Sequence, residues 1–314
     1  MVKVCLVTYL REGEVFTTEL EQIADGFHDK YGDDFKVTIC CESNFESKDY
    51  SYIVEQYISC GTKYRRLISL MEKDDSQFYF SVDNDITGNI GEMLQLAEQT
   101  IKQDCDIGWG RIRAQRVSGT ISNLVAVDKL LSHTIIRPIL WNAGCGISVP
   151  GQVFFIRASS YRGKLINLDT FLDDVALGLY VNVNEHKKYI TKAVLGFERP
   201  NTTFKGLWSQ RSRWAVGYAS ILLGVKDNKK YSRLVRIHGL SYHASWILVW
   251  SIIILTAIVS WKVSLIVAII IAAIISREEP VKIGYSLLYI LFFPIFHIRW
   301  GHVLIGEIKK RWKN

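Results

Sequence analysis

This chain lacks Cys-x-x-Cys motifs and the two common glycine-rich loops that bind phosphate. Its six cysteines include no Cys-x-x-Cys pair, so we expect neither a zinc site nor a disulfide framework and interpret them as free thiols in a reducing compartment. No Gly-x-Gly-x-x-Gly turn follows the first expected strand, and no Gly-x-x-x-x-Gly-Lys-Ser/Thr loop occurs. The chain also lacks zinc-finger spacing and an RNA-binding aromatic signature, so its net charge of +7 does not indicate a nucleic-acid partner.

A long apolar region is present instead, and it is confined to the C-terminal part. Hydrophobic residues make up 49% of the 314 residues and dominate from about Tyr242 onward, whereas residues 1–235 have a soluble composition. Basic clusters flank the apolar part at residues 229–236 and 309–313. Because basic flanks of apolar spans usually lie in the cytoplasm, we expect a multi-pass protein of the cell membrane. Its parts would be a cytoplasmic domain at 1–235, a transmembrane region at 243–305 and a basic tail at 306–314.

The transmembrane region is expected to contain two or three segments. Residues 244–276 would form a helix of about 50 Å, too long for a hydrocarbon core of ~30 Å. The sequence Ser260-Trp261-Lys262 interrupts this stretch and favours a hairpin of two spans, with Trp261 at the membrane interface. Residues 283–305 form a third apolar segment that contains Pro294. We interpret it as re-entrant or interfacial, with a third full span as the alternative.

The N-terminal part alternates strands and helices. Strands are expected at 2–8, 35–41 and 78–82, with helices at 15–31 and 67–73 between them. This order is typical of an α/β fold whose parallel sheet has helices on both faces. Further expected elements are a helix at 90–103, strands at 107–112 and 153–157, a mixture of helix and loop at 121–139, and a helix that begins near residue 170.

The third strand ends in the tripeptide Asp83-Asn84-Asp85. In an open α/β sheet, ligands bind beyond the carboxyl ends of the strands. Paired carboxylates at that place suit a Mg²⁺ or Mn²⁺ ion that takes its other ligands from water and a substrate diphosphate. The alternative is an ordinary solvated turn, because Asp and Asn are common turn residues.

Other polar residues are expected at the same edge of the sheet. Thr8, Tyr9 and Glu42 end the two neighbouring strands, and right-handed crossovers place these ends side by side. Lys63, with Arg65 or Arg66, could help to neutralise a phosphate, although a solvated basic helix start is the alternative. Glycines at 144, 146 and 151 indicate tight turns or a close approach of the backbone to a ligand.

Two further groups of residues could carry chemistry. Asp173 and Asp174 lie at an expected helix start, where one carboxylate could act as a general base; helix-dipole stabilisation is the alternative. In Gln210-Arg211-Ser212-Arg213-Trp214, an arginine can bind phosphate, Trp214 can stack on a sugar and Gln210 can donate to an oxygen. The alternative is an interfacial amphipathic helix at about 205–222, and both interpretations can hold together.

The ordered triple Asp-x-Asp, Asp-Asp and Gln-x-x-Arg-Trp resembles the family 2 glycosyltransferases, which have a GT-A fold (a Rossmann-like nucleotide-diphospho-sugar transferase domain). The likeness is to their membrane-embedded, often processive branch, which includes hyaluronan, chitin and cellulose synthases. It implies a metal-dependent, inverting hexosyltransferase with C-terminal transmembrane helices. The chain begins at the catalytic domain, without the N-terminal transmembrane helices of many synthases, which puts a self-contained polymer channel in question.

The resemblance also implies roles for the individual residues. Asp83 and Asp85 would hold Mg²⁺ or Mn²⁺, and Asp83 would contact the UDP-sugar together with the residues Thr8, Tyr9, Glu42 and Lys63. Asp174 would deprotonate the acceptor, supported by Asp173, while Gln210, Arg213 and Trp214 would cover the diphosphate and acceptor. Glu42 stands where the family usually has an Asp that contacts uracil.

The acceptor and the partners follow from the same resemblance. We expect transfer to a growing polysaccharide or a lipid-linked glycan at the membrane, with partner membrane subunits or a homo-oligomer possible. A single-addition transferase acting on a polyprenyl phosphate or glycolipid is the alternative, and a non-catalytic membrane subunit is a third hypothesis. Product length separates the first two hypotheses, because only polymerisation gives a ladder of products.

Overall fold

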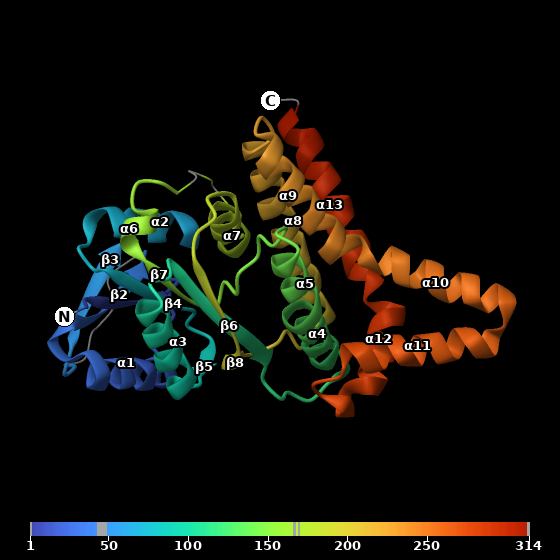
Figure 1. The fold of residues 1–314 in the computed structure, drawn as a ribbon, viewed down its shortest axis with the longest axis horizontal. Helices are drawn as coiled ribbons and strands as arrows, with labels where there is room; N and C mark the ends of the chain where they lie inside the picture. Colours follow the sequence, from blue (N-terminus) through green and yellow to red (C-terminus); the bar gives the residue numbers. More distant parts are fainter. Residues whose placement is uncertain (1, 43–48, 166–167, 169, 313–314) are drawn as a thin grey trace. The chain divides into compact units, whose positions relative to one another are not determined.

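The computed structural model describes residues 2–42, 49–165, 168 and 170–312. These residues form two compact units (Figure 1). The first unit contains residues 1–112 and 148–198, and the second contains residues 113–147 and 199–314. The division predicted from the sequence, into a catalytic domain at 1–235 and a membrane region at 243–305, stays a prediction, because compactness and immersion in a membrane are different properties.

The first unit is built on an eight-stranded mixed sheet with the strand order β3-β2-β1-β4-β7-β6-β8-β5. The strands are β1 (Val4–Tyr9), β2 (Phe35–Cys41), β3 (Ile53–Ile58), β4 (Phe78–Val82), β5 (Ile86–Gly88), β6 (Ile107–Ala114), β7 (Val153–Arg157) and β8 (Lys188–Glu198). The first four strands are parallel, as predicted for β1, β2 and β4, although β3 was not predicted. In contrast, β7 runs antiparallel to β4 and β6, and β5 runs antiparallel to β8. The expectation of a parallel sheet therefore holds for one half of the sheet only.

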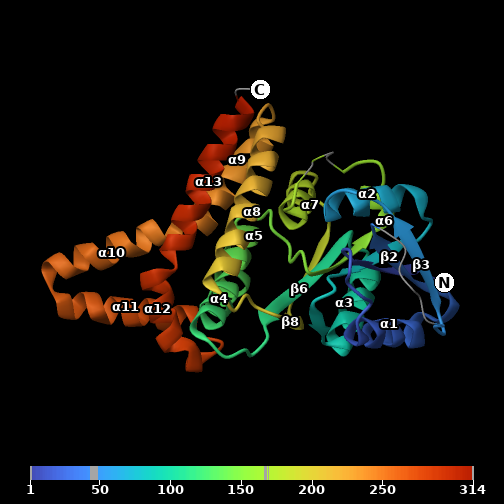
Figure 2. The same ribbon diagram turned by 180° about the vertical axis from the view of Figure 1, so that it is seen from behind.

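Helices cover both faces of this sheet (Figures 1 and 2). The helices α1 (Thr18–Tyr31) and α3 (Ile90–Lys102) contact each other on one face, and α2 (Lys63–Lys73) and α7 (Asp173–Val183) contact each other on the opposite face, near the short α6 (Ala158–Tyr161). Leu6 and Phe80, from adjacent strands, share the main apolar cluster with Phe27 of α1, whose ring centroid lies 4.6 Å from that of Phe80. Alternate residues of β1 and β4 thus face the two helical layers.

The local signals that start the helices explain their bounds. Helix α1 was predicted from residue 15, but Thr17 accepts a hydrogen bond from the backbone N–H of Leu20 at 3.3 Å and caps the helix there. Helix α2 begins four residues earlier than predicted, at Lys63, directly after Gly61-Thr62. A single-turn 3-10 helix (Gly32–Asp34) joins α1 to β2.

The second unit is helical. It contains α4 (Thr120–Leu131), a π-helical turn (Ser132–Ile136), α5 (Arg137–Asn142), α8 (Phe204–Gly224), α9 (Lys229–Gly239), a second π-helical turn (Leu240–Ala244), α10 (Ser245–Val259), α11 (Trp261–Ile275), a 3-10 turn (Pro280–Lys282), α12 (Ile283–Phe292) and α13 (Pro294–Trp312). The expected mixture of helix and loop at 121–139 is wrong, because the chain is helical from α4 through α5.

Two prolines lie at the starts of helices in this unit: Pro138 is in the first turn of α5, and Pro294 opens α13, which is bent by 41° from α12. Pro138 and Pro294 lack a backbone N–H, so each frees the carbonyl four residues earlier. The Arg277 guanidinium donates to the freed Thr134 carbonyl at 2.7 Å, and the Trp250 indole N–H donates to the freed Ile290 carbonyl at 2.9 Å. Both groups that the prolines leave without an intrahelical partner are therefore satisfied by side chains of other helices.

The helices α10 and α11 form an antiparallel hairpin, as the break at Ser260 predicted, and they lie side by side in both views (Figures 1 and 2). The continuous helix Lys229–Val259 is long and apolar enough to cross a membrane. Pro280–Phe292 and Pro294–Arg311 also pass the test as a pair, with a bend of 41°, and Trp261–Ile275 is a shorter apolar helix. The described residues thus contain one helix that could span a membrane, or two if the bent pair counts as one span.

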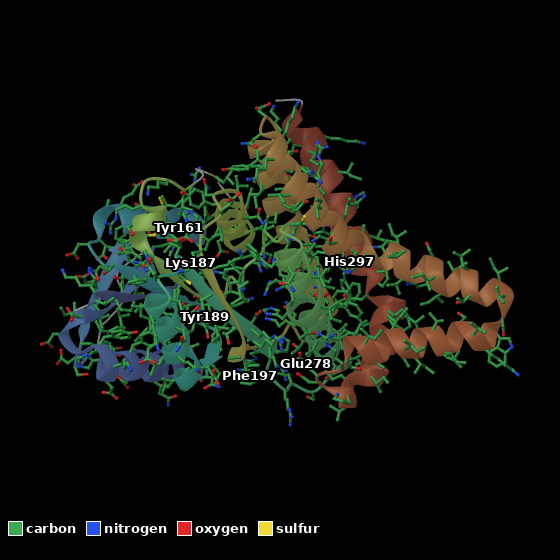
Figure 3. The ribbon with its side chains drawn as sticks, viewed as in Figure 1. Tyr161, Lys187, Tyr189, Phe197, Glu278 and His297 are labelled. Carbon is green, nitrogen blue, oxygen red and sulfur yellow. The ribbon has the colours of Figure 1, made fainter. Side chains whose placement is uncertain are left out.

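The turn between α11 and α12 is fixed by ion pairs within the second unit. The guanidinium of Arg113 donates to carboxylate oxygens of Glu278 at 2.9 Å and Glu279 at 3.1 Å. Figure 3 shows Glu278 at this turn. The turn after the second limb of the hairpin is therefore polar and anchored, unlike the exposed tip at Trp261, whose side chain is 69% accessible to solvent.

Candidate active site

The carboxyl ends of β1 and β4 lie next to each other and carry the first group of predicted residues. Strand β4 ends at Val82, and the backbone N–H of Asp83 donates to the carbonyl of Gln152 at 2.9 Å. This bond continues the pairing with β7 and fixes where the Asp83 side chain leaves the sheet. Asp85 is exposed two residues later.

Lys63 joins the first two predicted motifs. Its Nζ atom donates to Asp83 Oδ1 at 2.6 Å and lies 3.3 Å from Asp173 Oδ2. It also donates to the carbonyl of Gly151 at 2.5 Å. Asp83 and Asp173 are ninety residues apart in the chain, and one ammonium group binds both. The structure therefore brings the two motifs together through Lys63, whose role the sequence left open; the catalytic roles assigned to them stay predictions.

Burial and charge act against each other in this cluster. Burial alone would lower the pKa of Lys63, but the charges of Asp173 and Asp83 raise it above its ordinary value. The pKa of Asp83 is also raised, because burial and the nearby Asp173 carboxylate disfavour its charged form more than Lys63 favours it. Two carboxylates share one cation, so this edge of the sheet has an excess of negative charge.

The second motif opens α7 and lies against a glycine. A Cβ atom on Gly151 would stand 3.1 Å from Asp174 Cβ and 3.5 Å from Asp173 Oδ2, so a side chain at this position would crowd both carboxylates. The groups close to Gly151 are thus the two aspartates, whereas the predicted approach of its backbone to a ligand stays a prediction. Ser148 donates to Asp174 Oδ2 at 3.4 Å, a contact that the sequence analysis missed.

The other predicted donor-site residues lie around this cluster. Thr8 is fully buried at the end of β1, and its hydroxyl has no hydrogen-bond partner among the residues that the structure describes. The ring centroid of Tyr9 lies 5.0 Å from Lys63 Nζ. Glu42, which is exposed, forms an ion pair with the buried Arg66, so Arg66 orients this carboxylate. Arg66 is therefore a structural partner of Glu42, whereas the sequence suggested only that it could assist with a phosphate.

The carboxylates at this edge of the sheet suit a divalent cation that takes some of its ligands from a bound substrate. Among the described residues, no group of three or more His, Cys, Asp or Glu side chains is placed to hold a metal ion. Asp83 and Asp85 offer hard oxygen ligands, and no residue in the described part of the chain forms a hydrogen bond with the buried amide oxygen of Asn84 between them. Mg²⁺ is commonly held by one or two carboxylates together with substrate phosphates and waters, so the residues present fit such an ion.

The third predicted motif lies on α8, in the second unit. Gln210 accepts a hydrogen bond from the Asn201 side-chain amide at 3.0 Å, and Arg213 is exposed. The indole ring of Trp214 lies under the guanidinium of Arg211, whose Cζ is 4.4 Å from the ring centroid. The motif residues are thus held within one helix, and their association with the carboxylate cluster of the first unit stays a prediction.

Arg211 itself has a structural role that the sequence analysis did not identify. It is 3% exposed and donates to Asp128 Oδ2 of α4 at 2.5 Å, while the Tyr289 hydroxyl of α12 donates to Asp128 Oδ1 at 2.7 Å. Burial opposes ionisation of Asp128, but the charge of Arg211 outweighs it and lowers the pKa of this carboxyl. An aspartate inside the stretch 124–131, which is apolar except for Asp128 and Lys129, was the signal that could have revealed this ion pair.

The chain was compared with protein-family models, curated proteins and solved structures, and only solved structures match it. Neither a protein-family model nor a curated protein matches this chain. Among solved structures, the mannosyltransferase PcManGT from Pyrobaculum calidifontis, in complex with GDP-Man and Mn²⁺, matches with a TM-score of 0.57 and 9% identity over 98% of this chain and 87% of that chain. TarS 1–349 from S. aureus matches with a TM-score of 0.44 and 12% identity, covering 93% of this chain and 91% of that chain.

A further match is glucosyl-3-phosphoglycerate synthase from Mycobacterium tuberculosis, in complex with Mn²⁺, UDP and phosphoglyceric acid. Its TM-score is 0.47 and its identity 11%, with 71% of this chain and 78% of that chain covered. At these identities, the likeness to the mannosyltransferase concerns the fold alone. The predicted fold class is confirmed to this extent: the chain has a mixed α/β sheet of the GT-A type.

Proposed function

We propose that this chain is a metal-dependent glycosyltransferase that inverts the anomeric carbon of a nucleotide-diphosphate sugar. The observation that carries the proposal is the cluster in which Lys63 binds both Asp83 and Asp173 beside Gly151. A carboxylate pair at the carboxyl end of a GT-A-type sheet is suited to a metal-bound diphosphate, and a second carboxylate pair beside it is suited to proton transfer. No glycine-rich phosphate loop competes for the first task.

The donor side of the site would be formed by the first unit. Asp83 and Asp85 would hold Mg²⁺ or Mn²⁺, which neutralises the charge that develops on the leaving diphosphate. Thr8, Tyr9 and Glu42 end the strands beside Asp83 and would contact the nucleoside. We retain UDP as the expected nucleotide from the resemblance, and GDP is the competitor to include in any test, since PcManGT was solved with GDP-Man.

The acceptor side of the reaction would depend on Asp174. Its carboxylate would accept the proton of the acceptor hydroxyl as that oxygen attacks the anomeric carbon, and the bond from the sugar to the diphosphate would break in the same in-line step. Ser148 donates to one oxygen of Asp174 and helps to orient it. Asp173, which is paired with Lys63, is the supporting carboxylate.

The second unit would supply the membrane attachment and the remaining contacts. We propose that Gln210, Arg213 and Trp214 of α8 contact the diphosphate and acceptor. The helix Lys229–Val259 supports attachment to the cell membrane with the first unit in the cytoplasm, and the hairpin α10–α11 and the bent pair α12–α13 would complete a multi-pass region. The acceptor would be a growing polysaccharide or a lipid-linked glycan.

The deciding experiment is donor turnover by the purified full chain in nanodiscs. UDP-sugars and GDP-mannose would be supplied with Mn²⁺, with Mg²⁺ or with EDTA, and nucleotide release and product size would be followed. We expect release with one donor, loss of release in EDTA and in Asp83→Asn, and normal release in Asp75→Asn, an exposed aspartate that pairs with Lys3. Equal turnover in Asp83→Asn and Asp75→Asn would reject the metal assignment.

A further inference from the structure

Two basic groups of residues lie at the ends of helices in the second unit. Residues 226–236 contain five lysines and arginines but one acidic residue, and residues 307–312 contain three and one. The first group covers the turn before α9 and most of α9, and the second ends α13. A long, mostly apolar stretch separates the two groups in the sequence, so only the structure can show whether they lie together.

Helix α8 brings the two groups to the same end of the unit. The Tyr218 hydroxyl donates to the carbonyl of Val235, so α9 folds back along the last turns of α8. The Arg311 guanidinium donates to the Ser220 hydroxyl at 2.9 Å, so the last turn of α13 lies at the same part of α8. Both ribbon views show the C-terminal end of α13 beside α8 and α9 (Figures 1 and 2). The two basic groups therefore share one end of the second unit.

Helix α9 exposes its basic residues along one side. Lys229, Arg233 and Arg236 are exposed and follow one another at intervals of four and three residues, so they lie on one face of the helix. Leu234 and Val235, on the other side, are buried. The charges of α9 therefore point away from the packed interior of the unit, towards a partner outside the chain.

The same helix continues directly into apolar residues. Lys229–Val259 is one continuous helix of 31 residues, which is about 46 Å long. A hydrocarbon core of ~30 Å accommodates about 20 residues, which here are Leu240–Val259, and leaves α9 for the headgroup region and the water beyond it. Leu240 follows Arg236 by one turn and is 65% exposed. The exposed surface thus changes from basic to apolar at Leu240, as it does at the boundary between phosphate headgroups and hydrocarbon.

We propose that the basic residues of α9 and of the last turn of α13 form one surface that binds the anionic phospholipids of the cytoplasmic leaflet. Charge complementarity selects an anionic partner, and the unbroken passage into an apolar helix selects a lipid surface rather than a nucleic acid. The inference goes beyond the donor and acceptor of the proposed function and rests only on its membrane attachment. It also places the end of α13 on the same side of the membrane as the start of α9, so the pair α12–α13 would not cross the membrane as a single span.

The test is the headgroup selectivity of the purified full chain in detergent. Binding of dioleoyl phosphatidylglycerol and of dioleoyl phosphatidylcholine, which have identical tails, would be measured by native mass spectrometry. A basic residue near an anionic membrane surface contributes about fivefold to binding. We therefore expect phosphatidylglycerol to bind about tenfold more tightly or better, because one headgroup can contact more than one basic residue. This preference should shrink as the salt concentration rises, since salt screens exposed charges.

Removal of four charges together tests the surface itself. One variant combines Lys229→Gln, Arg233→Gln, Lys309→Gln and Lys310→Gln, all at exposed positions of the two groups. The matched control removes the same charge at exposed positions elsewhere, with Lys102→Gln, Arg116→Gln, Lys192→Gln and Lys205→Gln. We expect the preference for phosphatidylglycerol to fall to about twofold or less in the first variant and to stay within about twofold of wild type in the control. Because all the replaced side chains are exposed, both variants should melt at the temperature of the wild type.

Four results would overturn the proposal. They are equal binding of the two lipids by the wild type, an unchanged preference in the first variant, an equal loss in both variants, and displacement of phosphatidylglycerol by glycerophosphate or single-stranded DNA. The last result would indicate a site for soluble anions or nucleic acid. UDP-sugar turnover in the same samples separates this inference from the proposed function. Turnover without headgroup selectivity would reject the lipid surface alone, and selectivity without turnover would reject the transferase alone.

Discussion

Replacing Lys63 by methionine tests the cluster on which the proposed function depends. Lys63 Nζ lies 2.6 Å from Asp83 and 3.3 Å from Asp173, and the Lys63 side chain is 18% exposed. Methionine retains most of the aliphatic volume but removes the charge. Two carboxylates would then face each other without their shared cation, while the packing of α2 against the sheet stays nearly unchanged.

The expected magnitude follows from the burial of this group. Removal of one partner from a buried ion pair destabilises a protein by about 3–5 kcal/mol. Because the Asp83 side chain is 32% exposed and water can reach it, we expect the lower end, about 3 kcal/mol. Lys3→Met is a control matched in distance, since Lys3 also lies 2.6 Å from a carboxylate, that of Asp75, but both side chains are more than half exposed. It should lower stability by less than about 1 kcal/mol.

A divalent cation should reverse the loss in Lys63→Met. With its ammonium gone, the carboxylate pair has no competing cation, and Mn²⁺ at 100 times its dissociation constant would restore about 2.7 kcal/mol. Thermal unfolding of wild type, Lys63→Met and Lys3→Met, each with and without Mn²⁺, measures both effects. If Lys63→Met is as stable as Lys3→Met, or if Mn²⁺ stabilises all three proteins equally, the shared-cation description of this site is wrong.

Three further predictions concern the same unit. Asp174→Asn should retain UDP binding but lower the transfer rate by about 10²–10⁴, the usual contribution of a general base, and full activity in this variant would reject that role. Gly151→Ala places a Cβ atom 3.1 Å from that of Asp174 and should reduce transfer more than it reduces unfolding temperature, as rate and melting measurements together would show. For Asp74, burial raises the pKa, but hydrogen bonds from Lys36 and Ser76 outweigh it and lower the pKa from 3.8 to about 2. The resulting stability, about 2 kcal/mol, should be present above pH 4 and lost as the pH falls towards 2, and a chemical-denaturation series should show a smaller loss in Asp74→Asn.

The sequence predicted the centre of the first unit well because its signals there are local. The strand Phe78–Val82, aromatic or β-branched at every position except Ser81, is fully buried, and the aspartate that follows must lie where this strand leaves the core. The break at Ser260 was equally clear, because a single apolar helix through that point would be too long for a membrane. The meeting of Asp83 and Asp173 was anticipated only through the resemblance, since no local pattern links positions ninety residues apart.

The sequence predictions were wrong or incomplete where contacts between residues distant in the sequence decide the structure. Strand β3 was missed because Ile53–Ile58 is an edge strand with mostly half-exposed or exposed side chains, so it lacks the apolar run of its neighbours. The antiparallel pairing of β8 with β5 joins residues more than a hundred positions apart, and no turn signal connects them. The stretch 121–139 was predicted as a mixture of helix and loop, but it is helical, and a residue distant in the sequence, Arg277, donates to the carbonyl of Thr134 within it.

The two prolines make helical segments of the second unit depend on one another. The backbone of the π-helical turn Ser132–Ile136, directly before α5, relies on the guanidinium of Arg277 beyond the end of α11, and the backbone of α12 relies on an indole from α10. Neither segment can keep all its carbonyls satisfied if its donor helix moves away. Opening of the α10–α11 hairpin should therefore speed amide hydrogen exchange around both Thr134 and Ile290, and these segments should unfold together as one cooperative unit.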